Sequence, residues 1–327
     1  MASELTVFEH SLWIGNYMSG ILYGVELVMY FLTMQGLFSK GNHNTPRSRK
    51  FFAIFSTVLL LLLTIDIAVN AVWCQLMWIN SRDQPGGVPA YIGTQVSVWY
   101  QTMGSTTVVM MIFMGDALLL YRLFIIYGSK YWVIAFPILA YLAAFSLAII
   151  ELVLAGRPGG NFFGGRTINF GTPYYTITIS LNIIVTLLIC LRLAKLGKAV
   201  SKALGPDSAR MYTGVASMLI ESAAPYSLVG IMFLIPYAMG SPTAISFGQV
   251  WAKLTCLAPQ LIVLRVVTGR AWGKDVVTQA QSGVDFRMKP AGRSTGIELQ
   301  THTFTHGGTT LGEEAPEKWN SSTKSLA

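Results

Sequence analysis

Charged residues are scarce in this sequence. Only 12% of the 327 residues are Asp, Glu, Lys or Arg, whereas a soluble domain carries about 25%. Hydrophobic residues make up 53% of the chain, and its mean hydropathy is +0.52. Length alone would allow two soluble domains. The composition instead predicts an integral membrane protein whose main partner is the lipid bilayer.

Cysteine and histidine are also few. The three cysteines, Cys74, Cys190 and Cys256, lie in apolar runs without metal-ligand spacing. We therefore expect no disulfide framework and no metal site. The four histidines lie outside the apolar runs, and these runs hold no HExxH, His–acid or Ser–His arrangement. The sequence favours a protein that is not an enzyme and has no cofactor.

Seven apolar runs are long enough to cross a bilayer, which takes about 20 residues. They lack the alternation of β-strands, so helices are expected to satisfy their backbone in lipid. The predicted fold is an all-α, seven-transmembrane-helix bundle over residues 1–274, followed by a disordered cytoplasmic tail over 275–327. The predicted spans are 12–38, 51–79, 95–121, 131–154, 173–194, 212–237 and 243–266.

Basic residues predict the orientation. Up to residue 274, fourteen Lys and Arg residues lie on one side of the spans and three on the other. Because cytoplasmic segments carry the basic excess, the N-terminus is predicted outside and the C-terminus in the cytoplasm, at the plasma membrane. This excess accounts for the net charge of +8, so no nucleic-acid partner is expected. The outer segment 155–173 is either a flap or a flexible connector.

Five ionisable residues lie well inside the spans, where charge is costly and normally faces the interior of the bundle. They are Glu26, Asp66, Asp116, Glu221 and Lys253. Glu221 and Lys253 both fall near the midplane of consecutive spans, so an ion pair between them is within geometric reach. Lys253 is interpreted as a partnered interior lysine, and contact with a ligand or ion is the alternative.

Helical spacing places Lys253 on a polar stripe with Ser246, Gln249, Cys256 and Gln260. A second stripe on the fifth span consists of Thr178, Asn182 and Thr186. Such stripes line either a cavity or a hydrogen-bonded helix interface, and the sequence leaves both open. The candidate intramembrane polar site comprises Glu26, Asp66, Asn182, Glu221, Gln249, Lys253 and Gln260.

A lysine midway along a seventh span is also where rhodopsins form a Schiff base with retinal. Microbial rhodopsins place an Asp four residues before that lysine, where this chain has Gln249. Their third helix carries an acid near the chromophore, whereas Asp116 is expected in the cytoplasmic third of its span. Retinal binding is therefore the least favoured of the hypotheses for Lys253.

Asp116 and Arg122 form a candidate cytoplasmic switch at the inner end of the third span. They are six residues apart, roughly 600° around a helix, so they do not share a face. An acid and an arginine at this place are similar to the switch region of G-protein-coupled receptors, although the spacing differs. The alternative is that Arg122 extends to the lipid headgroups.

Small residues and prolines suggest how the helices pack. Pro137, Pro225 and Pro259 lie inside spans, where each removes a backbone donor and is expected to kink its helix. Gly20 and Gly24 form a GxxxG pair, which is a weak signal for helix packing. Kinked helices suit a bundle that changes shape, and they also occur in static ones.

Three phrases, "GDALLLYRLFIIYG", "ESAAPYSLVGIMFLIPY" and "APQLIVLRVVTGRAW", resemble seven-helix membrane proteins of mushroom-forming basidiomycete fungi. The resemblance covers about residues 15–275. It implies an integral seven-helix protein with a variable cytoplasmic tail, and it carries no assigned ligand or reaction. The motifs of the fungal pheromone receptors are not found in the chain.

The function favoured by these observations is a receptor-like sensor of an unknown small ligand, with a signalling partner at the basic cytoplasmic surface. The alternative is a transporter or channel for a small solute or proton, which would use the interior acids and Lys253. Retinal binding stands third.

Overall fold

The computed structural model describes residues 2–39, 46–95, 97–128, 131–157, 165–204 and 206–267. Every regular element in these ranges is a helix. The predicted tail over 275–327 and residues 158–164 of the outer segment lie outside the described residues. From residue 165 onward the outer segment is helical, so this part of it does not form a flap.

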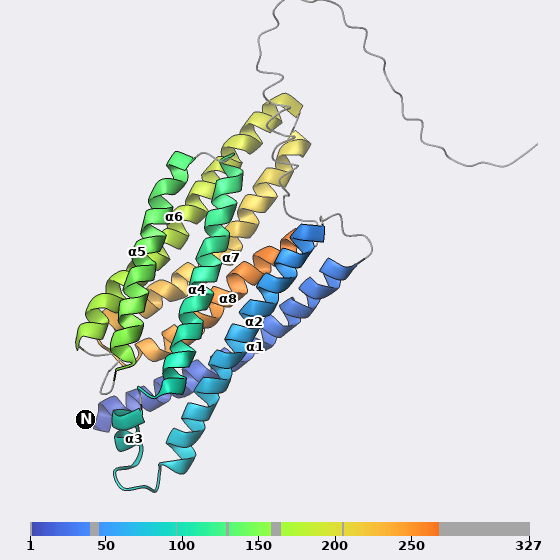
Figure 1. Cartoon of the computed structure of the whole chain (residues 1–327). Helices are drawn as coiled ribbons and strands as arrows, with labels where there is room; N and C mark the ends of the chain where they lie inside the picture. Colours follow the sequence, from blue (N-terminus) through green and yellow to red (C-terminus); the bar gives the residue numbers. More distant parts are fainter. Residues whose placement is uncertain are drawn as a thin grey trace, which may run out of the picture. The chain divides into compact units, whose positions relative to one another are not determined.

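Seven of the described helices are long and apolar enough to span a bilayer, which confirms the predicted number of spans. Figure 1 shows the helices α1 (Ala2–Phe38), α2 (Pro46–Gln75) with a π-helical turn (Leu76–Asn80), α3 (Gly87–Gln95), α4 (Trp99–Ile126), α5 (Tyr131–Ala155), α6 (Gly165–Leu204), α7 (Pro206–Ala238) and α8 (Ala244–Val267).

The boundaries differ from the prediction at several ends. The short helix α3 was not predicted, and the third span, expected from residue 95, begins at Trp99. The first, fifth and sixth spans extend well beyond the predicted apolar runs, to Ala2, Leu204 and Pro206. Hydropathy marks the part of a helix that lies in lipid, whereas the backbone continues as a helix past it.

Large apolar side chains are exposed on the outside of the spanning helices. Phe31 is 66% exposed, Leu139 67% and Trp132 94%. A soluble protein would not leave this much apolar surface in water, because such patches drive association. The exposed side chains therefore agree with an integral membrane protein that is surrounded by acyl chains.

The spanning helices form a closed ring in which each contacts the next along the chain and α8 contacts α1. α4 also packs on α6 and α8, and α8 also packs on α2. α4 and α8 are accordingly the most buried of the seven spans. Polar side chains on these two helices are therefore the best placed to form an interior site.

α1 and α8 run in the same direction and are in contact from Ser11 and Ser246 to Gly36 and Val267, because glycines on α1 allow a close approach. A Cβ on Gly15 would lie 3.0 Å from Cβ of Gln249, and a Cβ on Gly36 would lie 2.7 Å from Cγ1 of Val267. Gly20 and Gly24 do not have this role, since a Cβ on either would meet nothing within 4 Å. The predicted packing role of the GxxxG pair within this chain is therefore wrong.

An aromatic core joins α4, α5, α6, α7 and α8 at the end of the bundle where α8 begins. Trp251 of α8 stacks on Phe233 of α7, with ring centroids 5.4 Å apart. At the edge of this core the buried Glu151 accepts a hydrogen bond from the Tyr237 hydroxyl, at 3.1 Å. Gly171 leaves the room for that bond, since a Cβ there would lie 2.2 Å from the hydroxyl oxygen.

Candidate functional site

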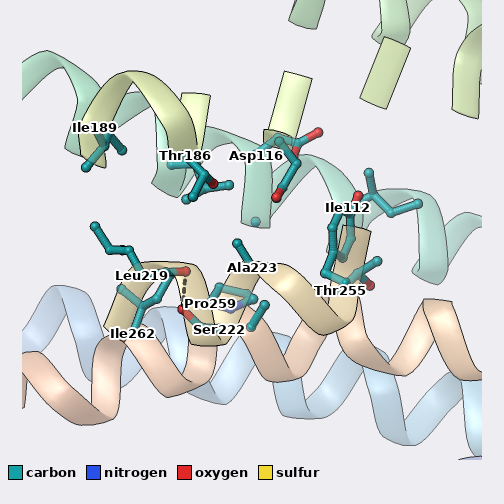
Figure 2. A pocket seen from close by; sticks show the side chains of 15 residues that line it. Ile112, Asp116, Thr186, Ile189, Leu219, Ser222, Ala223, Thr255, Pro259 and Ile262 are labelled. Atoms are coloured by element: carbon teal, nitrogen blue, oxygen red, sulfur yellow. Dashed lines mark hydrogen bonds between the residues drawn. The ribbon is translucent and has the colours of Figure 1, made fainter. Parts of the chain in front are cut away.

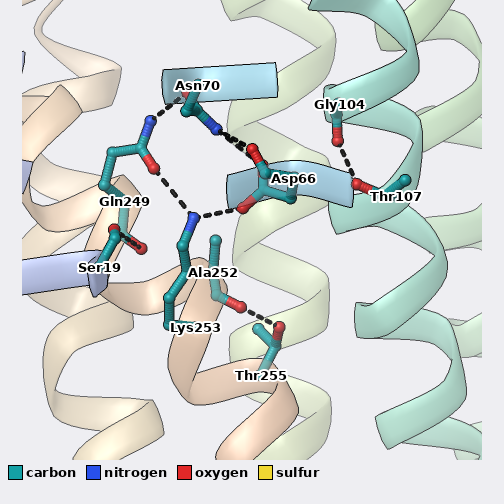
Figure 3. A network of polar contacts seen from close by, with 9 residues as sticks. All are labelled: Ser19, Asp66, Asn70, Gly104, Thr107, Gln249, Ala252, Lys253 and Thr255. Atoms are coloured by element: carbon teal, nitrogen blue, oxygen red, sulfur yellow. Dashed lines mark hydrogen bonds and ion pairs between the residues drawn. The ribbon is translucent and has the colours of Figure 1, made fainter. Parts of the chain in front are cut away.

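Lys253 lies midway along α8 in a closed ring of four polar side chains. Its ammonium group forms an ion pair with Asp66 of α2 and donates to Oε1 of Gln249 at 3.0 Å. Gln249 donates to Oδ1 of Asn70 at 3.0 Å, and Asn70 donates to Oδ1 of Asp66 at 2.9 Å. Figure 3 shows this Lys253–Asp66–Asn70–Gln249 ring between α2 and α8. The side chains of the ion pair are 1% and 4% exposed, so the charges compensate each other inside the bundle.

The predicted pairing of Lys253 with Glu221 is wrong. Glu221 accepts a hydrogen bond from Arg265 instead, at 3.3 Å, and its side chain is 65% exposed. Glu221 and Lys253 lie at a similar depth in consecutive helices, but a similar depth does not make two side chains face each other. Asp66 comes from a span distant in sequence and meets α8 because α2 packs against it.

The polar stripe of α8 forms a hydrogen-bonded interface with α1 and α2. Ser246 donates to the carbonyl oxygen of Ser11 at 2.9 Å, and Gln260 donates to Oγ1 of Thr33 at 3.1 Å. Lys253 lies between these two contacts. The sequence left open whether the stripe lines a cavity or an interface, and the observed bonds make it an interface.

Glu26 of α1 is the acid of this interface without a base beside it. Its side chain is fully buried, and the neighbouring polar group is the thiol of Cys256. Within the described part of the chain, neither carboxylate oxygen makes a hydrogen bond of good geometry. Glu26 therefore lies in the same helix interface as Lys253, but outside the Lys253–Asp66–Asn70–Gln249 ring.

A separate small cavity lies between α4, α6, α7 and α8. It holds about 20 Å³ of space for the centre of a water-sized sphere, and a single water needs roughly 10–15 Å³ on that measure. Figure 2 shows Asp116 and Thr186 on one side of it, facing Ser222 and Pro259 across the space. Its polar lining consists of Asp116, Asn182, Thr186, Ser222, Tyr226 and Thr255.

The structure thus divides the predicted polar residues between three places, because Glu221 lies with Arg265, away from both Lys253 and the cavity. Asn182 was predicted with the Lys253 group, but it lines the cavity together with Asp116. Asp66, Gln249, Lys253 and Gln260 lie together at the interface of α8 with α1 and α2. Sequence reasoning missed Asn70 in the ring, although its position four residues after Asp66 on the same helix was a usable signal.

Arg122 forms no hydrogen bond or ion pair with Asp116, in line with their spacing. Its Nη2 donates to the carbonyl oxygen of Ile262 on α8 at 3.4 Å. Near the same end of α8, Arg265 pairs with Glu221 of α7. We call these two contacts, Arg122 with Ile262 and Arg265 with Glu221, the clasp. The clasp ties the last turns of α4 and the middle of α7 to the last turns of α8.

The surroundings of Lys253 do not fit retinal. Its ammonium group is already bonded to Asp66 and Gln249, and the residue is 1% exposed. Lys253 does not line the described cavity, which has room for a single water. A Schiff base would need a long apolar cavity that begins at this nitrogen, so the described geometry argues against the retinal hypothesis.

No protein-family model matches the chain, and no curated protein is significantly similar to it. The resemblance to the basidiomycete seven-helix proteins therefore stays a prediction. The function is argued below from the chain's own contacts.

Proposed function

We propose that this integral membrane protein is a receptor-like sensor that switches between two arrangements of α7 against α4 and α8. One observation supports the proposal: the same turns of α7 and α8 line the cavity and form the clasp. Ile262 lines the cavity with its side chain and accepts the clasp bond with its carbonyl oxygen. On α7, Leu219 and Ser222 line the cavity on either side of Glu221, which belongs to the clasp.

Because the two sites share backbone, a change in the cavity moves the clasp. Pro225 on α7 and Pro259 on α8 each remove one helical hydrogen bond beside the cavity, which lowers the resistance of both helices to bending. The clasp bonds are long and partly exposed, so their contribution is small. A weak contact coupled to a hinged helix is the kind of element that a ligand can bias.

The proposal places the sensor in the plasma membrane, with the N-terminus outside and a signalling partner at the cytoplasmic face. The stretch between the fifth and sixth predicted spans is mostly helix, since α6 continues to Leu204 and α7 begins at Pro206. Lys195 and Lys198 are exposed on this extension of α6. We propose that they offer a basic surface to an acidic partner.

Spin-label distance measurements in lipid nanodiscs test the switch. One label replaces Ile220 on α7 and the other Ile54 on α2, both exposed, in a variant without the three native cysteines. Arg265→Gln breaks the clasp, and an exposed pair is worth up to about 1 kcal/mol, so the ratio of two distance populations should change by up to about fivefold. Lys198→Gln is the matched control, because it removes the same charge outside the clasp and should leave the ratio unchanged.

The sensor proposal fails if a single distance distribution persists in the wild type and in Arg265→Gln. It also fails if Lys198→Gln changes the populations as much as Arg265→Gln, because the shift would then follow net charge and not the clasp.

A transporter for a small solute or proton is the second candidate. The three buried ionisable residues Glu26, Asp66 and Lys253 favour a transporter, because ionisable side chains inside membrane helices often line ion pathways. Flux into liposomes, measured with a pH-sensitive dye and with ion-selective probes, separates the two functions. The sensor proposal expects the same leak as in protein-free liposomes, whereas flux that disappears in Lys253→Met would favour a transporter.

A further inference from the structure

Asp116 is a buried acid without a counter-charge. The residue is 3% exposed, and it has no hydrogen bond or ion pair to any described residue. The titratable side chains around it are Tyr141, Tyr174 and Tyr226, none of which supplies positive charge. Among the described residues that line the cavity, none is basic. An isolated carboxylate inside a membrane bundle is unfavourable unless something compensates its charge.

The other polar groups of the cavity offer oxygen atoms. Oδ1 of Asn182 and Oγ1 of Thr186 are buried and have no hydrogen-bond partner among the described residues. The two side chains come from successive turns of α6, so they reach the cavity from one side. Together with Asp116, they give one carboxylate, one amide oxygen and one hydroxyl oxygen without a donor to bind.

A backbone carbonyl adds a fourth oxygen. Pro259 has no N–H, so it cannot donate the helical bond that the carbonyl of Thr255 would otherwise accept. This carbonyl oxygen points toward α4 beside Asp116, since it would lie 3.4 Å from a Cβ on Gly115. Thr255 and Pro259 both line the cavity. Pro259 therefore frees a ligand atom on α8 for the site.

We propose that this cavity binds one monovalent alkali cation, with sodium as the ion of matching chemistry. Hard cations take oxygen ligands from carboxylates, amides, hydroxyls and backbone carbonyls. One carboxylate neutralises a single positive charge, whereas a divalent ion would leave an uncompensated charge in the bundle. The space of about 20 Å³ admits an occupant the size of one water and excludes an organic amine.

The ion would bridge α4, α6 and α8 beside the clasp, and so would favour the arrangement in which the clasp is formed. This consequence rests on the proposed sensor function, but the binding of the ion itself does not. The cation site is therefore tested first by equilibrium stability, which needs no signalling partner.

The experiment measures the thermal midpoint of the detergent-solubilised full chain as sodium chloride replaces choline chloride at constant ionic strength and pH. Sodium should raise Tm by roughly 5 °C, the shift expected at about a hundredfold excess over Kd. Asp116→Asn should abolish the sodium effect and should be more stable than the wild type in choline, because it removes the uncompensated charge. Glu151→Gln is the matched control, a buried acid outside the cavity, and should keep the full sodium effect.

Thr186→Val provides a second test that does not alter the charge, in case Asp116→Asn does not fold. It removes one oxygen ligand at nearly constant volume, so the sodium concentration at half-maximal effect should rise severalfold. The inference is overturned if sodium and choline give the same wild-type Tm, or if Asp116→Asn or Thr186→Val keeps the full response. It is also overturned if the wild-type Tm follows pH alone, because the site would then hold a proton.

The two proposals fail separately. A sodium-dependent Tm without any change in the label distances would support the cation site and refute the switch. A clasp-dependent change of distances in a protein whose Tm ignores sodium would do the reverse.

Discussion

Replacement of Lys253 by Met tests whether the buried ring stabilises the bundle. The substitution removes the ion pair to Asp66 and the bond to Gln249, and leaves a buried carboxylate with Asn70 as its remaining partner. Breaking one member of a buried ion pair costs about 3–5 kcal/mol, because the remaining charge is uncompensated. Methionine fills a similar volume with an unbranched chain, so the packing cost is minor. We therefore expect the free energy of unfolding to fall by about 3–5 kcal/mol.

The double variant Lys253→Met with Asp66→Asn separates the charge from the packing. It removes both charges and keeps an amide beside Asn70, so most of the lost stability should return. The free energy of unfolding is measured by titration with sodium dodecyl sulfate in lipid–detergent micelles. Glu221→Gln is the control, since an exposed pair should cost about 1 kcal/mol or less. The stabilising role of the ring would be refuted if the losses of the two single variants, Lys253→Met and Asp66→Asn, simply add up in the double variant. A loss below about 1 kcal/mol for Lys253→Met alone would refute it as well.

Three further results are expected. Gly171→Ala should lower the free energy of unfolding by about 1–3 kcal/mol, because its Cβ would overlap the Tyr237 hydroxyl. The bond between Tyr237 and Glu151 should then break, which near-ultraviolet circular dichroism would detect as a loss of signal. Gly24→Ala, whose Cβ meets nothing, should change the free energy of unfolding by no more than about 0.5 kcal/mol, and equal losses in the two variants would refute the reasoning. Gly15→Val should separate α1 from α8 and lower Tm, and an unchanged Tm would contradict the close approach. Epitope tags at the two ends should be accessible from opposite faces of intact cells, and access from the same face would contradict the seven spans.

Periodicity and hydropathy predict most of the fold because membrane helices must satisfy their own backbone. All seven spans were found in this way, and so was the stripe that carries Ser246, Lys253 and Gln260. The helix ends were less predictable, since the apolar run ends before the backbone leaves the helix, as it does in α6. The helix α3 was not predicted, because a nine-residue segment with glycine and proline has no long apolar run.

The partners of the polar residues could not be predicted from one helix at a time. Spacing gives the face of a helix and counting gives its depth, but neither says which neighbour packs on that face. Depth therefore suggested Glu221 as the partner of Lys253, whereas the contact between α2 and α8 brings Asp66 to it. The cavity was hidden for the same reason, because Asp116, Asn182 and Thr255 meet only when three helices come together.

The Lys253–Asp66 pair has a consequence for how the protein is made. The two residues are 187 positions apart, and Lys253 belongs to α8, which leaves the ribosome after the other six described spans. Until that span is inserted, the nascent chain holds an acid in the membrane without its base, and the surface of α1 that α8 will cover remains open. The ring can close only after α8 is inserted, so a chain that ends before α8 would leave Asp66 without Lys253 and this surface of α1 uncovered.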